Sequence, residues 1–124
     1  MPSNDERGTL IRKAIQSCQA KGIGLIYSSW GILWNKKKER WEPKAPACCA
    51  LACAILEYQD KPGRKLDWRQ WTIEKILDVN SEWVRNFQLG FDGYDKSVYD
   101  DGSLAYELGS SLRKEFGFPI ACSL

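Results

Sequence analysis

The stretch PACCALACAILEY, residues 46–58, decides the fold. Alanine, cysteine, leucine and isoleucine cover every side of a helical projection here, and a helix that is apolar all round belongs in the centre of a core. Proline suits the first turn of a helix. We therefore predict a core helix over 46–58. The uncharged run 45–56 is shorter than the roughly 20 residues of a membrane span, so we expect no membrane contact.

Before the core helix, the sequence predicts a first helix over 5–21. Apolar side chains recur there at helical spacing and form one stripe, and Gly22 marks the C-terminal end. The stripe consists of Leu10, Ile11, Ala14, Ile15 and Cys18. This pattern is typical of an amphipathic helix that packs on a core.

The hairpin region 23–42 has a different texture, because β-branched, aromatic and glycine residues alternate in it. A polar, lysine-rich run separates Trp34 from Trp41, which predicts a β-hairpin. The strands are expected over 29–34 and 40–42, with Pro43 ending the second. An isolated hairpin is marginal in water, so it must lie against helices.

Three further helices are predicted within 67–116. We expect Asp67 to cap the first, Asn80 or Ser81 the second and Ser103 the third. The apolar positions of the first two helices are Trp68, Trp71, Ile76, Leu77, Trp83, Val84, Phe87 and Phe91. In the third helix, the residues expected to face inward are Leu104, Ala105, Leu108, Leu112 and Phe116. Residues 117–124 are expected to form a tail. The sequence therefore predicts a mainly α protein bordering on α+β: one compact domain over 1–124, with about five helices and a small two-stranded hairpin.

The composition removes several kinds of catalytic site. The 124 residues include no histidine, which excludes Ser-His-Asp triads, Cys-His pairs and histidine-ligated zinc. The remaining residues form no recognisable catalytic constellation. We therefore predict a protein that is not an enzyme, with no catalytic residues and no cofactor.

Four acidic residues of the C-terminal half are a candidate site of their own. They lie between the second and third helices of the trio, at Asp92, Asp95, Asp100 and Asp101. Their spacing does not match a calcium-binding loop, so we predict a solvated loop. A deep pocket converging on Asp92 and Asp95, or on Cys49 and Cys53, would instead be the sign of an enzyme.

Five cysteines are present, at positions 18, 48, 49, 53 and 122. Cys49 and Cys53 are four residues apart and could both turn toward Cys18 or Cys122, so a four-thiolate site is conceivable. Metal-binding cysteines typically come in loop-borne CxxC pairs, which this sequence lacks, and a free cysteine on an apolar helix acts as a small hydrophobe. We therefore predict no metal site. The odd cysteine count and an acidic N-terminus unlike a secretory signal predict a cytoplasmic protein.

Charge is distributed unevenly along the chain. Residues 1–66 hold twelve Lys and Arg against six Asp and Glu, whereas residues 67–124 hold six against ten. The basic side chains gather around the predicted hairpin tip, between two rings. We predict a partner-binding surface there, made of Trp34, Lys36, Lys37, Lys38, Arg40 and Trp41. Its expected partner is an acidic protein face, or a second copy of the chain in head-to-tail association.

Exposed aromatic side chains would strengthen the prediction of a partner surface. Tryptophan and tyrosine carry much of the binding energy where proteins meet. Solvent exposure of Trp30, Trp34, Trp41 or Tyr94 would therefore point to a partner, whereas complete burial would mean that they belong to the core.

Nucleic-acid binding is the alternative function. Residues 68–91 have the hydrophobic spacing of a helix-turn-helix unit; the positions are Ile73, Leu77, Val79, Val84 and Phe87. The nucleic-acid-binding residues would then be Ser81, Arg85 and Asn86, or the basic hairpin itself. Glu74 and Asp78 fit the helix-turn-helix pattern badly, because a small residue and a glycine are usual at their positions. The second helix also offers a single cation to phosphate.

Overall fold

The computed structural model describes residues 3–27, 29–44, 46–59, 68–94 and 104–116. Its helices are α1 (Asn4–Ala20), α2 (Ala50–Tyr58), α3 (Arg69–Leu77), α4 (Ser81–Phe91) and α5 (Leu104–Glu115). Its strands are β1 (Gly24–Leu25), β2 (Ile32–Asn35), β3 (Arg40–Pro43) and β4 (Ala47–Cys48). The prediction of a mainly α fold with five helices and a small hairpin is confirmed. No helix in these ranges combines the length and apolarity that crossing a membrane requires.

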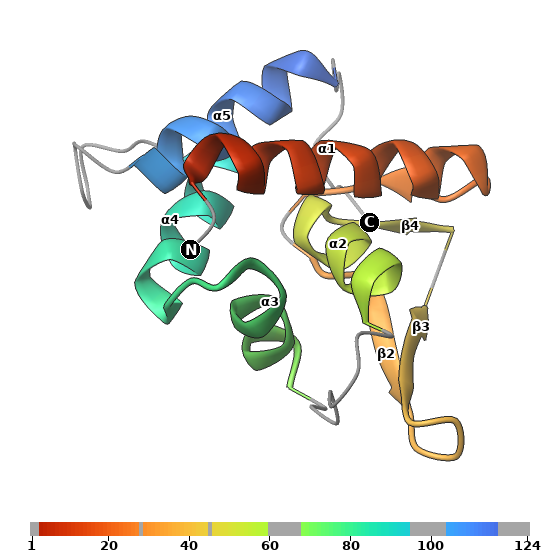
Figure 1. Ribbon diagram of the computed structural model, residues 1–124. Coiled ribbons are helices and arrows are strands. Elements are labelled where there is room, and N and C mark those ends of the chain that lie inside the picture. The colour runs from red at the N-terminus through yellow and green to blue at the C-terminus, as the bar shows by residue number, and fades with distance from the viewer. Residues whose placement is uncertain (1–2, 28, 45, 60–67, 95–103, 117–124) are drawn as a thin grey trace.

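Helix α2 lies at the centre, and α1 runs across it with α5 on the other side of α1 (Figure 1). The hairpin β2–β3 projects from the end of the molecule opposite α4 (Figure 1). Residues 50–55 of α2 are all buried, as the apolar sequence predicts. Since α2 has no polar face in this stretch, packing on every side stabilises it rather than helix propensity.

Helix α1 begins with a capping box that the sequence analysis did not identify. The Ser3 hydroxyl accepts a hydrogen bond from the Glu6 N–H, and the Glu6 carboxylate accepts one from the Ser3 N–H, both at 3.1 Å. These bonds satisfy two donors that a helix start leaves open. Apolar residues of the predicted stripe are buried, including Ile11, Ile15 and Cys18.

The core helix begins four residues later than predicted. Residues 47–48 form strand β4, which pairs in parallel with β1. The Gly24 N–H donates to the Pro46 carbonyl at 2.7 Å, and the Ile26 N–H donates to the Cys48 carbonyl at 3.1 Å. Because these carbonyls bind β1, the chain stays extended until Cys49, whose sulfur accepts from the Ala52 N–H and caps α2. The expected helical start at Pro46 is therefore wrong.

The predicted hairpin is confirmed as an antiparallel pair, with Trp34 opposite Trp41. Strand β2 starts at residue 32 rather than 29, because Gly31 adopts a φ of +74°, in the left-handed region that interrupts a strand. A Cβ at Gly31 would also overlap the Ala47 carbonyl oxygen of β4. At the other end, the Asn35 side chain accepts from two backbone N–H groups of the tip. The turn is therefore ordered by local bonds.

Helix α3 buries only part of its apolar surface. Trp68 and Trp71 are 65% and 57% exposed, because Thr72, Ile73 and Leu77 form the inward side. In α5, Leu104 is 68% exposed, so its predicted inward position is wrong. Trp68 occupies the cap position of α3 and makes no side-chain capping bond. The predicted cap residues Asp67 and Ser103 lie outside the described residues. The predicted cap at Asn80 is confirmed by a 2.8 Å bond from the Trp83 N–H.

Helices α4 and α5 cross in very close contact. A Cβ at Gly90 would overlap the Tyr106 carbonyl oxygen, and a Cβ at Gly109 would overlap the Phe87 carbonyl oxygen. The two glycines therefore let the backbones touch, in the way small residues do wherever helices approach closely. Both glycines are buried, and no other residue type fits this crossing without a shift.

Two arginines close the C-terminal ends of helices. Arg7 of α1 donates to the carbonyls of Leu77 and Asp78 at 3.0 and 2.8 Å, and Arg113 of α5 donates to the Phe91 carbonyl at 2.9 Å. A cation at this end satisfies open carbonyls and complements the helix dipole. Each bond also joins a helix end to a distant segment.

Candidate functional site

The tip of the hairpin carries the basic side chains that the sequence singled out. Lys36, Lys37 and Lys38 are exposed, and Arg40 is partly buried. At the tip, Lys38 Nζ lies 3.8 Å from Glu42 Oε2, with the Lys38 side chain 68% exposed. A solvated pair of this kind contributes little energy. The tip therefore presents its ammonium groups to solvent.

The two hairpin tryptophans differ in their surroundings. Trp41 is 5% exposed; its backbone N–H donates to Gln59 Oε1, its carbonyl accepts from Gln59 Nε2, and its indole N–H donates to Thr72 Oγ1 at 3.3 Å. The Trp34 ring is partly buried and meets Trp41 edge to face, with centroids 5.4 Å apart. Trp41 anchors the hairpin to the core and offers no ring to a partner, which corrects its predicted place on the surface.

Other aromatic rings are exposed beside the hairpin. Trp68 and Trp71 lie on α3 with ring centroids 6.4 Å apart. The Thr72 hydroxyl donates to the Trp68 carbonyl at 2.9 Å and accepts from the Trp41 indole. These two hydrogen bonds hold the N-terminal end of α3 against β3. Of the four residues singled out from sequence, Tyr94 is 56% exposed, whereas Trp30 and Trp34 are partly buried.

The predicted helix-turn-helix unit is a pair of helices, α3 and α4, joined by residues 78–80. Asp78 takes the left-handed conformation usual for glycine at this turn, with φ 55° and ψ 59°. Ser81 and Arg85 are exposed, but Asn86 is 6% exposed and cannot reach a base edge. Exposed Glu82 lies in the same first turns. The outer face of α4 therefore offers phosphate one cation beside one anion.

A cavity of about 260 Å³ brings Cys49 and Asp92 together. Burial and the Asp92 charge raise the pKa of the Cys49 thiol to about 12. A thiol held in its protonated form is a poor nucleophile. The cavity therefore joins one member of each pair that would indicate an enzyme, Asp92 and Cys49. The raised pKa of Cys49 opposes catalysis by its thiol. Asp95, Asp100, Asp101 and Cys122 lie outside the described residues.

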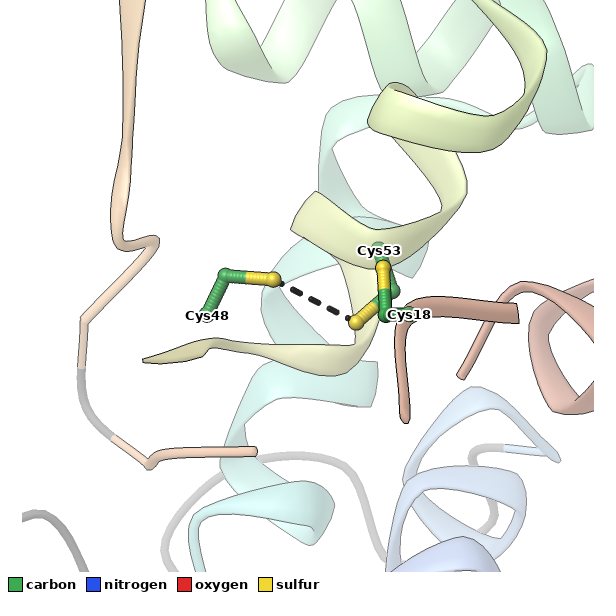
Figure 2. A group of neighbouring side chains, drawn as sticks. All are labelled: Cys18, Cys48 and Cys53. Atoms are coloured by element: carbon green, nitrogen blue, oxygen red, sulfur yellow. Dashed lines mark hydrogen bonds between the residues drawn. The ribbon is translucent and has the colours of Figure 1, made fainter. Parts of the chain in front are cut away.

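Three thiols converge in the interior (Figure 2). Cys18 comes from the last turn of α1, Cys48 from β4 and Cys53 from α2, and all three are buried. Their sulfur atoms lie within 4.8 Å of one another, and Cys48 Sγ is 3.4 Å from Cys53 Sγ. We call these three residues the thiol cluster. It differs from the four-thiolate arrangement considered from sequence, because Cys48 rather than Cys49 turns toward Cys53.

The thiols of the cluster polarise one another. Hydrogen bonds from Cys48 and Cys53, helped by the charge of Lys21, lower the pKa of Cys18 to about 4. The pKa values of Cys48 and Cys53 are raised, chiefly because their protons are held in bonds to Cys18. These contacts therefore favour loss of the first proton at Cys18 over its loss at Cys48 or Cys53.

Solvent reaches the edge of the cluster through a second cavity, of about 420 Å³. Cys18 lines this cavity together with side chains of the hairpin and of α2, including Lys21, Arg40, Glu57 and Gln59. The cavity therefore connects Cys18, which is 3% exposed, to charged groups of both signs.

One sequence signal could have revealed the cluster. The β-like segment 23–27 had no assigned partner, and a strand must pair to satisfy its backbone groups. Pairing residues 47–48 with this segment shortens the predicted core helix. It also places Cys48 in a strand, outside the helix that carries Cys53.

Comparison of the chain with protein-family models, with curated proteins and with solved structures gives no match.

Proposed function

We propose that this protein is a non-enzymatic binding module whose hairpin tip contacts an acidic surface of a protein partner. The observation that carries the proposal is the tip itself, which holds three exposed lysines on a hairpin fixed to the core by Trp41. A rigid, charged projection loses little conformational entropy on binding. We also propose a cytoplasmic location, because unpaired thiols persist in reducing compartments.

The exposed rings beside the hairpin support a protein partner. Trp68 and Trp71 expose more than half of their side-chain surface, and Thr72 connects their helix to the hairpin. Tryptophan is enriched among the residues that dominate binding energy at protein interfaces. Basic side chains would then steer the encounter, while the rings would slow dissociation.

Nucleic acid is a less favourable partner for this surface. The overall charge is +2, and the isoelectric point near 8.3 is modest, whereas nucleic-acid-binding domains usually carry a larger basic excess. Helix α4 is the alternative nucleic-acid-binding element, but its Asn86 is buried and its Glu82 is exposed. An acidic protein surface needs neither a large positive field nor base contacts.

The test compares three binding probes on the purified full chain: a labelled glutamate-rich peptide, a single-stranded oligonucleotide and a second copy of the chain. Replacing Lys36, Lys37, Lys38 and Arg40 together by glutamine should weaken peptide binding at least about tenfold, mainly through the association rate. The matched control removes four exposed cations elsewhere, by changing Lys13, Lys75, Arg85 and Lys114 to glutamine. It should leave most of the affinity.

Three results would overturn the proposal. The first is an equal loss of peptide binding in both quadruple variants, which would mean that net charge alone acts. The second is tighter binding of the oligonucleotide than of the peptide, with the steep salt dependence of phosphate contacts. The third is dimerisation in sedimentation experiments that the tip variant abolishes, which would make a second copy the partner.

A further inference from the structure

The thiol cluster gathers one kind of side chain from three distant parts of the chain. We propose that Cys18, Cys48 and Cys53 bind a single divalent thiophilic metal ion, of the zinc and cadmium class, through their three sulfur atoms. The three side chains point toward a common centre between α1, β4 and α2 (Figure 2). This proposal is independent of the hairpin surface and replaces the sequence-based expectation of structural cysteines.

The spacing of the sulfur atoms suits a metal. A zinc ion bonds thiolate sulfur at about 2.3 Å, so sulfurs that share one ion lie about 3.8–4.0 Å apart. The observed contact of 3.4 Å between Cys48 and Cys53, and the limit of 4.8 Å for all three pairs, bracket this spacing. Small rotations of the cysteine side chains would bring the three sulfurs to this spacing.

The backbone positions of the three cysteines are fixed without a metal. The Cys18 carbonyl accepts from the Ile23 N–H at 2.9 Å, the Cys48 carbonyl accepts from the Ile26 N–H at 3.1 Å, and the Cys53 N–H donates to the Cys49 carbonyl at 2.9 Å. Helix packing, strand pairing and the first turn of α2 therefore hold one thiol each. A preformed set of ligands binds without the cost of ordering them.

The ligand type selects the class of ion. Thiolate sulfur is a soft ligand that prefers zinc, cadmium and copper(I) to magnesium or calcium. Each ligand must lose its proton to solvent before it binds. Three thiolates leave a net charge of −1 with a divalent ion and −2 with a monovalent ion. Because burial of net charge is costly, the divalent ion is favoured.

The cavity beside Cys18 supplies an entry path and a place for a fourth ligand. Zinc prefers four ligands, and sites with three protein ligands complete the set with water. The cavity of about 420 Å³ reaches Cys18 and has Lys21 at its wall. The Lys21 ammonium also lies 3.8 Å from a Glu57 oxygen, and Arg40 and Glu42 line the same cavity. An ion from solvent can therefore reach the Cys18 side of the cluster without unfolding of the core.

The test titrates the reduced full chain with cadmium(II) against a chromophoric chelator, following thiolate-to-cadmium absorption in the ultraviolet. One cadmium should bind per chain, and its NMR shift should indicate three sulfur ligands. Cys18→Ala, Cys48→Ala and Cys53→Ala should each weaken binding by at least about a hundredfold, since loss of a direct ligand exceeds the 10–100-fold effect of an outer-shell group. Alanine is chosen because it buries no unpaired hydroxyl.

The neighbouring Cys49 provides the matched control, because it is buried and adjacent in sequence but caps α2. Cys49→Ala and Cys122→Ser should bind cadmium with unchanged affinity and stoichiometry. Circular dichroism should verify the fold of each variant, and Cys18→Ala, at the edge of the cluster, serves where Cys53→Ala does not fold. Zinc(II) should raise the Tm of the natural chain and leave that of Cys18→Ala unchanged.

The proposal would be overturned by retained cadmium binding in a folded variant that lacks Cys18, Cys48 or Cys53. Loss of binding in Cys49→Ala or Cys122→Ser would equally contradict a three-thiolate site. Binding of copper(I) without any binding of cadmium(II) or zinc(II) would contradict the divalent class.

Discussion

The hairpin tip and the thiol cluster are the two places where this protein gathers side chains of one chemical kind. At the tip, four cations lie within residues 36–40, and the three lysines among them are exposed. In the cluster, three sulfurs come from residues 18, 48 and 53 and face one another inside the core. The comparison teaches that a cluster of residues adjacent in sequence can be predicted from the sequence. A cluster in the interior depends on which segments pack together in the fold.

Trp41 connects the two regions, and its removal should have the largest effect. Trp41 belongs to strand β3 of the hairpin and is buried, and it also lines the cavity that leads to Cys18. Trp41→Ala should lower the free energy of unfolding by about 3–5 kcal/mol, because it empties a large buried site and breaks the bond to Thr72. Urea denaturation measures this loss. Trp34→Ala should cost clearly less, since Trp34 is only partly buried; equal losses would refute the anchoring role of Trp41.

Gly109→Ala should destabilise the molecule without involving either region. Its new Cβ would overlap the Phe87 carbonyl oxygen, and a backbone oxygen cannot move aside as a flexible side chain can. The expected loss is about 1–3 kcal/mol by thermal or urea unfolding.

The control for this prediction is Gly24→Ala, whose Cβ would meet its nearest atom, the Pro46 carbonyl oxygen, at an ordinary 3.5 Å. Its effect should stay within about 0.5 kcal/mol. A Gly109→Ala variant as stable as the natural chain would mean that α4 and α5 do not cross as closely as described. Cadmium and peptide binding by the folded fraction should be the same in both variants.

The pH dependence of stability should distinguish the cluster from the tip. Folding lowers the pKa of Cys18 from 9.0 to about 4, so between these values the unfolded state binds more protons than the folded state. The free energy of unfolding therefore gains a contribution that is present above pH 9.0, and this contribution disappears as the pH falls through about 4. Urea unfolding of the metal-free chain at several pH values should show the gain, and Cys18→Ala should reduce the slope.

The tip variant serves as the comparison for this experiment. Changing Lys36, Lys37, Lys38 and Arg40 to glutamine should leave the pH slope as it is in the natural chain. An identical slope in Cys18→Ala and in the natural chain would contradict the assignment of a Cys18 thiolate.

The smallest effect on stability is expected at the tip. The same quadruple glutamine variant should change the free energy of unfolding by less than about 0.5 kcal/mol, because three of the four cations are exposed lysines and the contact of Lys38 with Glu42 is long and solvated. Denaturation of the variant beside the natural chain measures the difference. A loss above about 1 kcal/mol would mean that the tip cations hold the fold together rather than remain available to a partner.

Much of the fold follows from local patterns, and the misassigned parts follow from long-range contacts. The apolar residues 50–55 and the cap at Asn80 were predictable, because each depends on residues within a few positions. The strand at 47–48 was not predictable, because its apolar residues are equally compatible with a helix. It forms because backbone N–H groups of the β1 segment bind the carbonyls of Pro46 and Cys48. Leu104 shows the same limit: helical spacing predicts that it faces inward, yet it is 68% exposed, and Ala105, Gly109 and Leu112 form the buried side of α5.

The sequence by itself determined the five helices, the hairpin and the charge of its tip, because helical period, turn residues and adjacent lysines act over short distances. Only the tertiary structure decided that Trp41 is buried and Trp68 exposed, and that Cys18 meets Cys48 and Cys53 while Cys49 turns away. These outcomes depend on which surfaces pack together, and packing joins residues that are far apart along the chain.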